Sequence, residues 1–242
     1  MTENDSLHAT RSAYDAVAAS YARLLPGTGA EADEDLAIVR RFAEAVPAGG
    51  RILDAGSGAG RMIGHLAALG HTQVDGVDLS PAMARQARLA HPTNGVVVAD
   101  LAELPFPDSR FQAVLAWYSV IHTPADGLAA VFAEFHRVLD SGGTLLLGFQ
   151  TGIGPRMIRR AYGHDVELTA YRHGVWGVAY RLEREGFRMG DALEREARRG
   201  ERDAQGFVLA PGLTEEAGSR GPLNRRGCRT DGMQSPARGH GS

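Results

Sequence analysis

Three aspartates, each at the end of a short apolar run, are the residues of this sequence best suited to hold a polar ligand. Asp54 lies in "RILDAG", Asp78 in "VDGVDLS" and Asp100 in "VVVAD". If these runs are neighbouring parallel strands, the three carboxylates meet at the carboxyl edge of one sheet, where such sheets bind ligands. Asp78 is placed to accept from ribose hydroxyls and Asp100 from an adenine amino group. The alternative is three unrelated, solvated loop acids.

A glycine-rich turn follows the first of these aspartates. In "DAGSGAG" the glycines stand at positions 56, 58 and 60, so the backbone at Gly56 and Gly58 can approach a ligand closely. Dinucleotide-binding turns have the order G-x-G-x-x-G and cradle a diphosphate. Here an acid precedes the first glycine by two residues, which suits an ammonium group better. The order favours S-adenosylmethionine over a nicotinamide cofactor, while a tight strand-to-helix turn without a ligand is the alternative.

A second group of side chains follows the run "FQAVLAWY". Trp117 and Tyr118 should lie beside a sulfonium, whose methyl group suits the face of an aromatic ring. His122, a few residues later, is the best-placed general base for a hydroxyl acceptor. The alternatives are packing aromatics and a histidine that caps the next helix.

The elements that must position these residues alternate between strand and helix from Arg51 onward. Two helices come first, at about residues 8–25 and 31–46, and the apolar runs then alternate with amphipathic segments. This order predicts an α/β fold, a doubly wound, mostly parallel sheet with helices on both faces. Strands are expected near residues 51–56, 72–80, 95–100, 111–118, 142–150, 187–196 and 205–210. Helices are expected near residues 61–70, 81–90, 125–139 and 174–186.

Composition divides the chain into parts with different expected roles. Residues 1–50 are predicted to form an N-terminal helical cap, and residues 51–210 the ligand-binding domain. Within that domain, the patchy pattern of 151–172 predicts an irregular insertion on the substrate side. Residues 211–242, rich in Gly, Arg, Pro and Ser, are predicted to form a disordered tail.

The charge balance excludes several classes of function. The 242 residues include 26 basic and 29 acidic side chains, for a formal net charge of −3, and no lysine is present. P-loop nucleotidases and Schiff-base enzymes need a lysine, so both are excluded. One cysteine allows no intrachain disulfide and no cysteine-based zinc cluster, and no metal site is expected. Nucleic acid and membrane partners are not expected. The expected location is the cytoplasm.

The motifs together resemble the class I S-adenosylmethionine-dependent methyltransferases, of the small-molecule type with an N-terminal helical cap. "LDAGSGAGR", "GVDLSPAM", "ADLAELPFPDSRF" and "LAWYSVIHTP" are similar to the family's first four motifs, and "EFHRVLDSGGTLLLGF" to its helix and fifth strand. "SAYDAVAASYARL" resembles the tyrosine pattern of the cap. The resemblance implies a Rossmann-like sheet of seven strands whose last strand runs antiparallel.

The resemblance also implies roles for single residues. Catalytic positions would be His122 and Tyr118. Cofactor-binding positions would be Tyr14, Tyr21, Asp54, Ala55, Gly56, Gly58, Arg61, Asp78, Leu79, Met83, Asp100, Leu101 and Trp117. Tyr14 and Tyr21 are alternatively core residues, and Arg61 is alternatively a solvated arginine. In the insertion, Arg156, Tyr162, His164 and Tyr171 are weaker candidates for a substrate pocket that would suit a carboxylate or polar oxygen.

The expected function is therefore methyl transfer from S-adenosylmethionine to a small organic molecule, plausibly in specialised metabolism. Transfer to oxygen is preferred over nitrogen or carbon. The alternatives are a nicotinamide-dependent oxidoreductase and a non-catalytic nucleoside-binding protein on the same scaffold. The acceptor, and whether the chain is a monomer or a homodimer, stay open.

Overall fold

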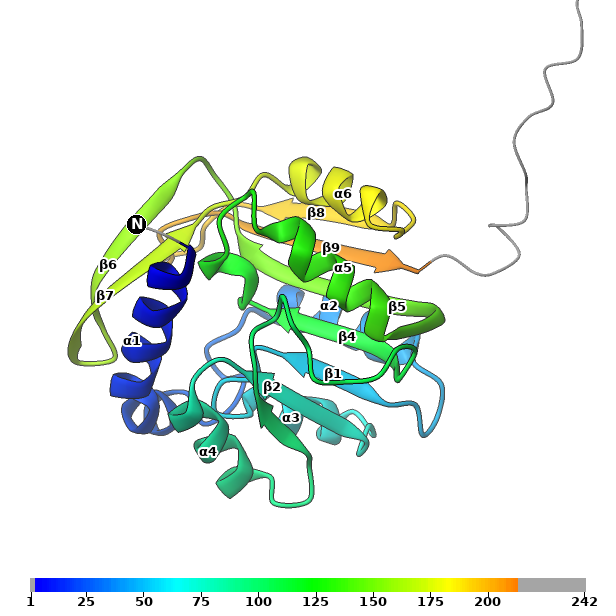
Figure 1. Cartoon of the computed structure of the whole chain (residues 1–242), viewed down its shortest axis with the longest axis horizontal. Helices are drawn as coiled ribbons and strands as arrows, with labels where there is room; N and C mark the ends of the chain where they lie inside the picture. The colour runs from blue at the N-terminus through cyan, green and yellow to red at the C-terminus, as the bar shows by residue number, and fades with distance from the viewer. Residues whose placement is uncertain (1–2, 213–242) are drawn as a thin grey trace, which may run out of the picture.

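A single seven-stranded sheet forms the centre of the molecule, in the order β3-β2-β1-β4-β5-β9-β8 (Figure 1). The computed structural model describes residues 3–212. β1 pairs in parallel with β2 and β4, while β9 is antiparallel to both β5 and β8. The predicted mostly parallel α/β sheet with an antiparallel last strand is thus confirmed. The strands are β1 (Ile52–Ala55), β2 (Val74–Asp78), β3 (Val96–Val98), β4 (Phe111–Trp117), β5 (Leu139–Gln150), β8 (Asp191–Arg195) and β9 (Gln205–Pro211).

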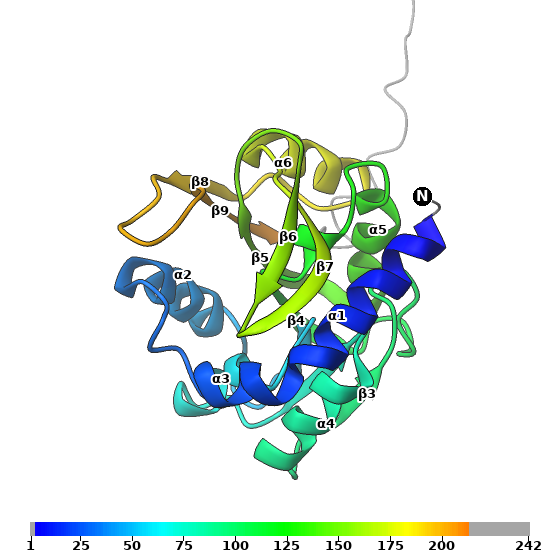
Figure 2. The same ribbon diagram turned by 90° about the vertical axis from the view of Figure 1, so that its left-hand side faces the viewer.

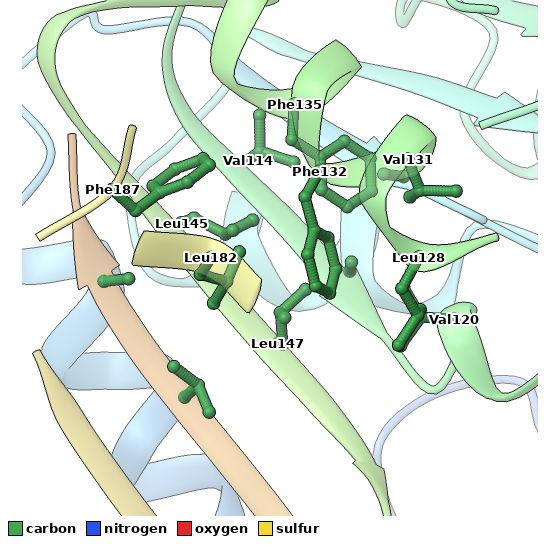
Figure 3. Close-up of a cluster of buried hydrophobic side chains, with 14 of the residues drawn as sticks. Val114, Val120, Leu128, Val131, Phe132, Phe135, Leu145, Leu147, Leu182 and Phe187 are labelled. Carbon is green, nitrogen blue, oxygen red and sulfur yellow. The ribbon is translucent and has the colours of Figure 1, made fainter. Parts of the chain in front are cut away.

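Helices cover both faces of this sheet. They are α1 (Glu3–Leu24), α2 (Asp33–Glu44), α3 (Arg61–Ala68), α4 (Pro81–Ala90), α5 (Leu128–Val138) and α6 (Val175–Arg184), with a short 3-10 helix at Val120–His122. α5 and α6 pack on one face through a cluster that includes Phe132, Phe135 and Leu182 (Figure 3). α2, α3 and α4 contribute to a second cluster with sheet residues such as Ile52 and Leu115.

The two clusters follow from the alternation of side chains along each strand. In β4, Val114 and Ala116 face the first cluster, whereas Ala113 and Leu115 face the second. Strands buried on both faces have continuous apolar sequences, which is why "AVLA" reads as an unbroken run. The loops that follow these strands are consequently the polar parts of the sheet's carboxyl edge.

Residues 151–172 do not form the irregular insertion that their sequence predicts. They contain a two-stranded hairpin, β6 (Pro155–Ala161) and β7 (His164–Tyr171), separate from the main sheet (Figure 2). Tyr162 and Gly163 make its turn, both with positive φ, as two-residue hairpin turns require. The sequence of the hairpin lacks a clear alternation of apolar and polar residues, because β6 is exposed or half-buried and its register shifts between Ile158 and Arg160.

Helix α1 and the hairpin lie side by side at the carboxyl edge (Figure 2). Val17 and Ala18 of α1 pack with Met83 of α4, and Tyr162 and Val166 of the hairpin join that cluster. Helix α2, by contrast, buries Val39, Phe42 and Ala43 in the sheet's second cluster. The first two helices therefore have different neighbours, and only α1 lies over the carboxyl edge with the hairpin.

The last strand extends beyond the predicted end of the domain. Pro211 is the last residue of β9 and pairs with Thr144, while Gly212 forms an isolated bridge with Phe187. The remainder of the predicted tail, 213–242, lies outside the described residues.

Candidate functional site

A cavity of about 280 Å³ opens at the carboxyl edge of the sheet, beneath α1. Its lining contains most of the residues singled out in the sequence: Tyr14, Tyr21, Gly56, Gly58, Arg61, Asp78, Leu79, Met83, Asp100, Leu101, Trp117, Tyr118 and His122. The structure thus gathers side chains from α1, four strand ends and the loop after β4 around one space. Of the three strand-end aspartates, Asp78 and Asp100 are part of this lining.

Asp54 and Ala55 lie behind the cavity and not in its lining. Both residues are buried, and neither carboxylate oxygen of Asp54 has a hydrogen-bond partner among the described residues. Burial, together with the nearby charge of Asp78, raises the pKa of Asp54 to about 8. In the unliganded protein at neutral pH, Asp54 is therefore mostly protonated, which reduces the cost of burying it.

This raised pKa predicts a pH dependence of stability. Because the pKa is higher in the folded than in the unfolded chain, the folded protein holds an extra proton between about pH 4 and pH 8. Its stability should fall as pH rises through this window, by up to about 1.4 kcal/mol per pH unit. Urea unfolding at several pH values should show a flatter profile for Asp54→Asn. The exposed-site control Asp165→Asn should keep the wild-type profile, and identical profiles for both variants would contradict the assignment.

Asp78 holds the glycine turn in place while it faces the cavity. Its Oδ2 accepts from the Gly58 backbone N–H at 2.8 Å, and its Oδ1 accepts from Ser80 N–H at 2.8 Å. Burial raises the pKa of Asp78 to about 6, and the two backbone hydrogen bonds oppose that rise. Each carboxylate oxygen keeps a free lone pair, so Asp78 can also accept from a ligand.

At Gly56, the glycine turn leaves no room for a side chain. Gly56 and Gly58 have φ values of +81° and +53°, in the left-handed region that favours glycine. A Cβ at Gly56 would lie 2.2 Å from that of Ser119, another cavity-lining residue whose buried Oγ has no partner among the described residues. The turn therefore brings backbone and one unsatisfied hydroxyl close to the cavity.

At the β3 side, the cavity combines one acid with apolar side chains. Asp100 Oδ1 accepts from Ala102 N–H at 3.0 Å. Met83, Leu79 and Leu101 line the same space. Ser80 caps α4 by accepting from Met83 N–H, which fixes the helix start beside the cavity. An acidic side chain among apolar side chains suits a nucleobase with an exocyclic amino group.

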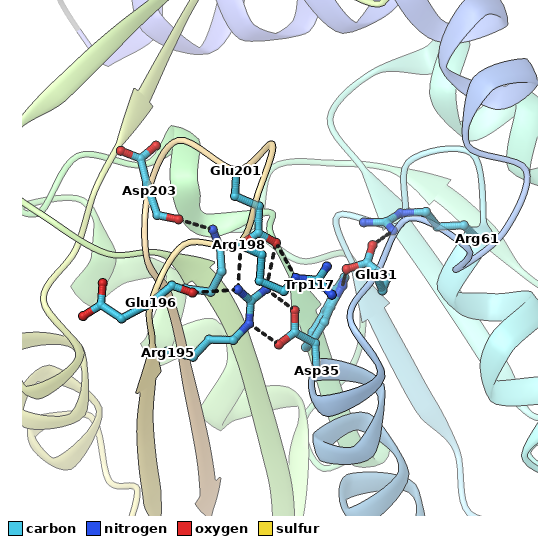
Figure 4. A network of polar contacts seen from close by, with 10 residues as sticks. Glu31, Asp35, Arg61, Trp117, Arg195, Glu196, Arg198, Glu201 and Asp203 are labelled. Atoms are coloured by element: carbon cyan, nitrogen blue, oxygen red, sulfur yellow. Dashed lines mark hydrogen bonds and ion pairs between the residues drawn. The ribbon is translucent and has the colours of Figure 1, made fainter.

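Arg61 is not the solvated arginine of the alternative interpretation. Its guanidinium forms an ion pair with Glu31, and only 11% and 10% of these two side chains are exposed. Glu31 also accepts from Trp117 Nε1 at 3.3 Å (Figure 4). The Trp117 ring stacks on Phe207 with centroids 5.5 Å apart. Glu31, which the sequence did not indicate, therefore connects two cavity-lining side chains from behind.

His122 belongs to a short hydrogen-bonded chain and does not cap a helix. Its Nδ1 lies 2.8 Å from the Thr169 carbonyl of β7, and its Nε2 lies 2.7 Å from the Tyr14 hydroxyl of α1. Because a carbonyl only accepts, Nδ1 carries the hydrogen and Nε2 accepts from Tyr14. Burial lowers the pKa of His122 to about 4 and raises that of Tyr14 well above its usual value. Both side chains are therefore neutral at pH 7.

This arrangement predicts that His122 does not titrate in the physiological range. Its ¹⁵N NMR signals should show the neutral Nδ1–H form down to about pH 5, because burial disfavours the imidazolium. Since the pKa is depressed in the fold, the corresponding stability should be lost as pH falls from about 6.5 to about 4. In Tyr14→Phe, the Nε2 signal should move toward that of an unbonded acceptor. A midpoint near 6.5 would contradict the assignment.

Sequence reasoning did not identify part of the lining, and it named three hairpin residues that do not line the cavity. The unpredicted lining residues are Leu7, Thr10, Leu25, Ser119, Ile121, Thr123 and Gln150. Of the four hairpin candidates, Tyr162 lines the cavity, with its ring 4.9 Å from that of Tyr21. Arg156, His164 and Tyr171 do not line it. Arg156 instead pairs with Asp203 at 3.2 Å, and His164 with Ser20 at 2.9 Å.

Residues 3–212 contain neither a candidate membrane span nor a candidate metal cluster. No helix there has the length and apolar character needed to cross a membrane. No group of three or more His, Cys, Asp or Glu side chains there is arranged to hold a metal ion.

Part of the chain is similar to known methyltransferases. Residues 52–143 match the family described as "Methyltransferase domain". The demethylmenaquinone methyltransferase of Chlorobaculum tepidum is 36% identical over 129 residues, which cover 53% of this chain and 50% of that protein. The malonyl-[acyl-carrier protein] O-methyltransferase of Pseudescherichia vulneris is 35% identical over 94 residues, covering 39% of this chain and 36% of the relative. The chain thus spans half or less of these relatives' length.

A solved structure supports the same fold over a longer stretch. The 1,6-didemethyltoxoflavin-N1-methyltransferase of Burkholderia thailandensis superimposes with a TM-score of 0.68 at 18% identity. The match covers 88% of this chain and 91% of that one, and that structure holds its substrate and S-adenosylhomocysteine. The likeness shows a shared fold that extends well beyond the family match.

Proposed function

We propose that this chain methylates a small organic molecule. The premise is that residues 52–143 form a methyltransferase domain of the class I S-adenosylmethionine-dependent type. The observation that carries the proposal is that Asp78, Asp100 and Arg61 line the same cavity. Two acids serve a nucleoside without phosphates, and one arginine serves a carboxylate. A nicotinamide dinucleotide would bring a diphosphate to the glycine turn, whose order, with Asp54 two residues before the first glycine, differs from the G-x-G-x-x-G order of diphosphate-binding turns.

The residues present fit S-adenosylmethionine. The carboxylate oxygens of Asp54 and the hydroxyl of Ser119 are buried without a partner among the described residues, close to the glycine turn. In the proposed arrangement, Asp78 holds the ribose hydroxyls and Asp100 the adenine amino group. Leu79, Met83 and Leu101 contact the adenine faces. Arg61 binds the carboxylate of the amino-acid portion, and the Gly56–Gly58 turn lies along that portion.

When bound, the cofactor supplies an activated methyl group, so the protein mainly has to align the acceptor and exclude water. Tyr21 of α1 and Tyr162 of the hairpin turn close one side of the cavity. Trp117 and Tyr118 place ring surfaces at the end of β4, next to the proposed sulfonium position. These four side chains would exclude water from the transfer.

The Tyr14–His122 contact supports oxygen as the acceptor atom. An acceptor hydroxyl beside Tyr14 passes its proton to the Tyr14 oxygen while the Tyr14 proton moves to His122 Nε2. The bound cofactor would supply the methyl group to the acceptor oxygen and leave as a neutral thioether. The proton taken up by His122 would then replace the positive charge that the methyl donor loses, so the net charge of the site would be unchanged. Burial disfavours the imidazolium form of His122. Proton transfer to His122 should therefore occur together with methyl transfer, when the sulfonium charge is lost.

Calorimetry and a labelled-methyl assay test the proposal. We expect micromolar binding of S-adenosylhomocysteine, and transfer of label from methyl-labelled S-adenosylmethionine to a compound in a small-molecule cell extract. NADH fluorescence should not change on mixing. Absence of heat with both S-adenosylmethionine and S-adenosylhomocysteine would refute cofactor binding. Binding without label transfer from extracts of the source cells would refute methyl transfer and favour a nucleoside-binding protein.

A further inference from the structure

Arg61 is the only arginine among the described residues that line the cavity. Its guanidinium is shielded, with 11% of the side chain exposed. A carboxylate-bearing ligand in this cavity therefore has one strong cationic partner. On the proposed function, on which this inference rests, that carboxylate belongs to the amino-acid portion of the cofactor.

The same guanidinium is already engaged by a carboxylate of the protein. Arg61 Nη1 pairs with Glu31 Oε1, and Glu31 Oε2 accepts from Trp117 Nε1 at 3.3 Å (Figure 4). Glu31 lies in the connection between α1 and α2 and does not line the cavity. Two donors of the cavity wall are thus held from behind by one largely buried acid.

We infer that Glu31 competes with the ligand carboxylate for Arg61 and thereby limits how tightly the protein holds nucleosides with an amino-acid tail. A second carboxylate on the same guanidinium is repelled by the first, and shielding from solvent strengthens that repulsion. The Glu31–Arg61 ion pair stabilises the protein before a ligand binds. Part of the free energy gained when the ligand carboxylate contacts Arg61 is therefore lost, because the ion pair is weakened. Glu31 acts through Arg61 and is a positioning residue, since it does not line the cavity.

A matched pair of ligands tests this inference by calorimetry. S-adenosylhomocysteine and 5′-methylthioadenosine share the adenosine and thioether groups, but only the first has the amino-acid tail. For Glu31→Gln we expect about tenfold tighter binding of S-adenosylhomocysteine, equivalent to about 1.4 kcal/mol. The Kd of 5′-methylthioadenosine should be unchanged. Glu31→Asp, which retracts the carboxylate by one methylene, should shift the first Kd in the same direction by less.

Further variants separate this effect from general changes in charge or folding. Glu34→Gln, at an exposed position in the first turn of α2, removes the same charge and should leave both Kd values unchanged. In an Arg61→Gln background, Glu31→Gln should no longer tighten S-adenosylhomocysteine binding. Circular dichroism and a thermal midpoint establish that each variant is folded. If Glu31→Gln does not fold, the same comparison with Glu31→Asp decides.

The outcomes are distinct from those that test the proposed function. If neither nucleoside binds the wild-type protein, the proposed function itself fails. If both bind and Glu31→Gln weakens S-adenosylhomocysteine, leaves it unchanged, or tightens both ligands equally, the competition inference is wrong. A tightening that persists without Arg61 would also overturn it.

Discussion

Asp78→Asn is expected to weaken S-adenosylhomocysteine binding by at least about 100-fold. The substitution replaces an oxygen acceptor by an amide that donates, so one of the backbone N–H groups of Gly58 and Ser80 faces another donor. It also removes the charged acceptor proposed for the ribose. Hydrogen bonds to charged groups contribute about 1.5–3 kcal/mol each, so the loss of one bond and of the turn's support accounts for this magnitude.

Calorimetry checks this result against a control on the same strand. Asp75 lies at the other end of β2, outside the cavity lining, and pairs with Arg110 at 3.1 Å. Asp75→Asn should bind S-adenosylhomocysteine as the wild type does. Wild-type affinity in a folded Asp78→Asn protein would remove Asp78 from the cofactor site.

Arg195→Met is expected to destabilise the fold by about 3–5 kcal/mol, as loss of one partner from a buried ion pair does. Arg195 of β8 binds both oxygens of Asp35 at 2.6 Å and also contacts Glu201 (Figure 4). The Asp35 side chain is only 2% exposed, so the variant leaves a buried carboxylate without its cation. The Arg195 guanidinium also holds the pKa of Glu201 at about 2.

Urea unfolding provides the measurement, with two further variants for comparison. Arg198→Met removes a more exposed arginine that contacts Glu201 at 3.4 Å, and it should cost less than about 1 kcal/mol. Asp35→Leu combined with Arg195→Met should recover much of the lost stability, because no uncompensated charge is then buried. If Arg195→Met unfolds at the same urea concentration as Arg198→Met, Asp35 does not depend on Arg195.

The sequence predicted the sheet because its strands are buried on both faces and its turns are marked by glycine and acids. The helix predicted at residues 81–90 matches α4, since Ser80 and Pro81 give it a chemically defined start. Strand ends also placed Asp78 and Asp100 in one cavity, because parallel strands end at one edge.

Contacts between distant segments were less accessible to sequence reasoning. Glu31 has no motif around it, and its partners Arg61 and Trp117 are 30 and 86 residues away. His122 lines the cavity, but its Nδ1–H tautomer is fixed by the Thr169 carbonyl, which belongs to a hairpin that the sequence pattern did not predict. Asp54 was expected at the ligand because it lies at a strand end, yet it is buried and does not line the cavity.

The position of β9 between β5 and β8 has a consequence for how the chain acquires its structure on the ribosome. β8 is paired with β9 alone, and β9 is formed by residues 205–211. While synthesis has reached only β8, the nascent sheet ends at β5, and that edge is open to pairing with the wrong partner. Insertion of β9 between these two strands joins β8 to the sheet and brings Arg195 to Asp35, so completion of the sheet and burial of this ion pair should occur together.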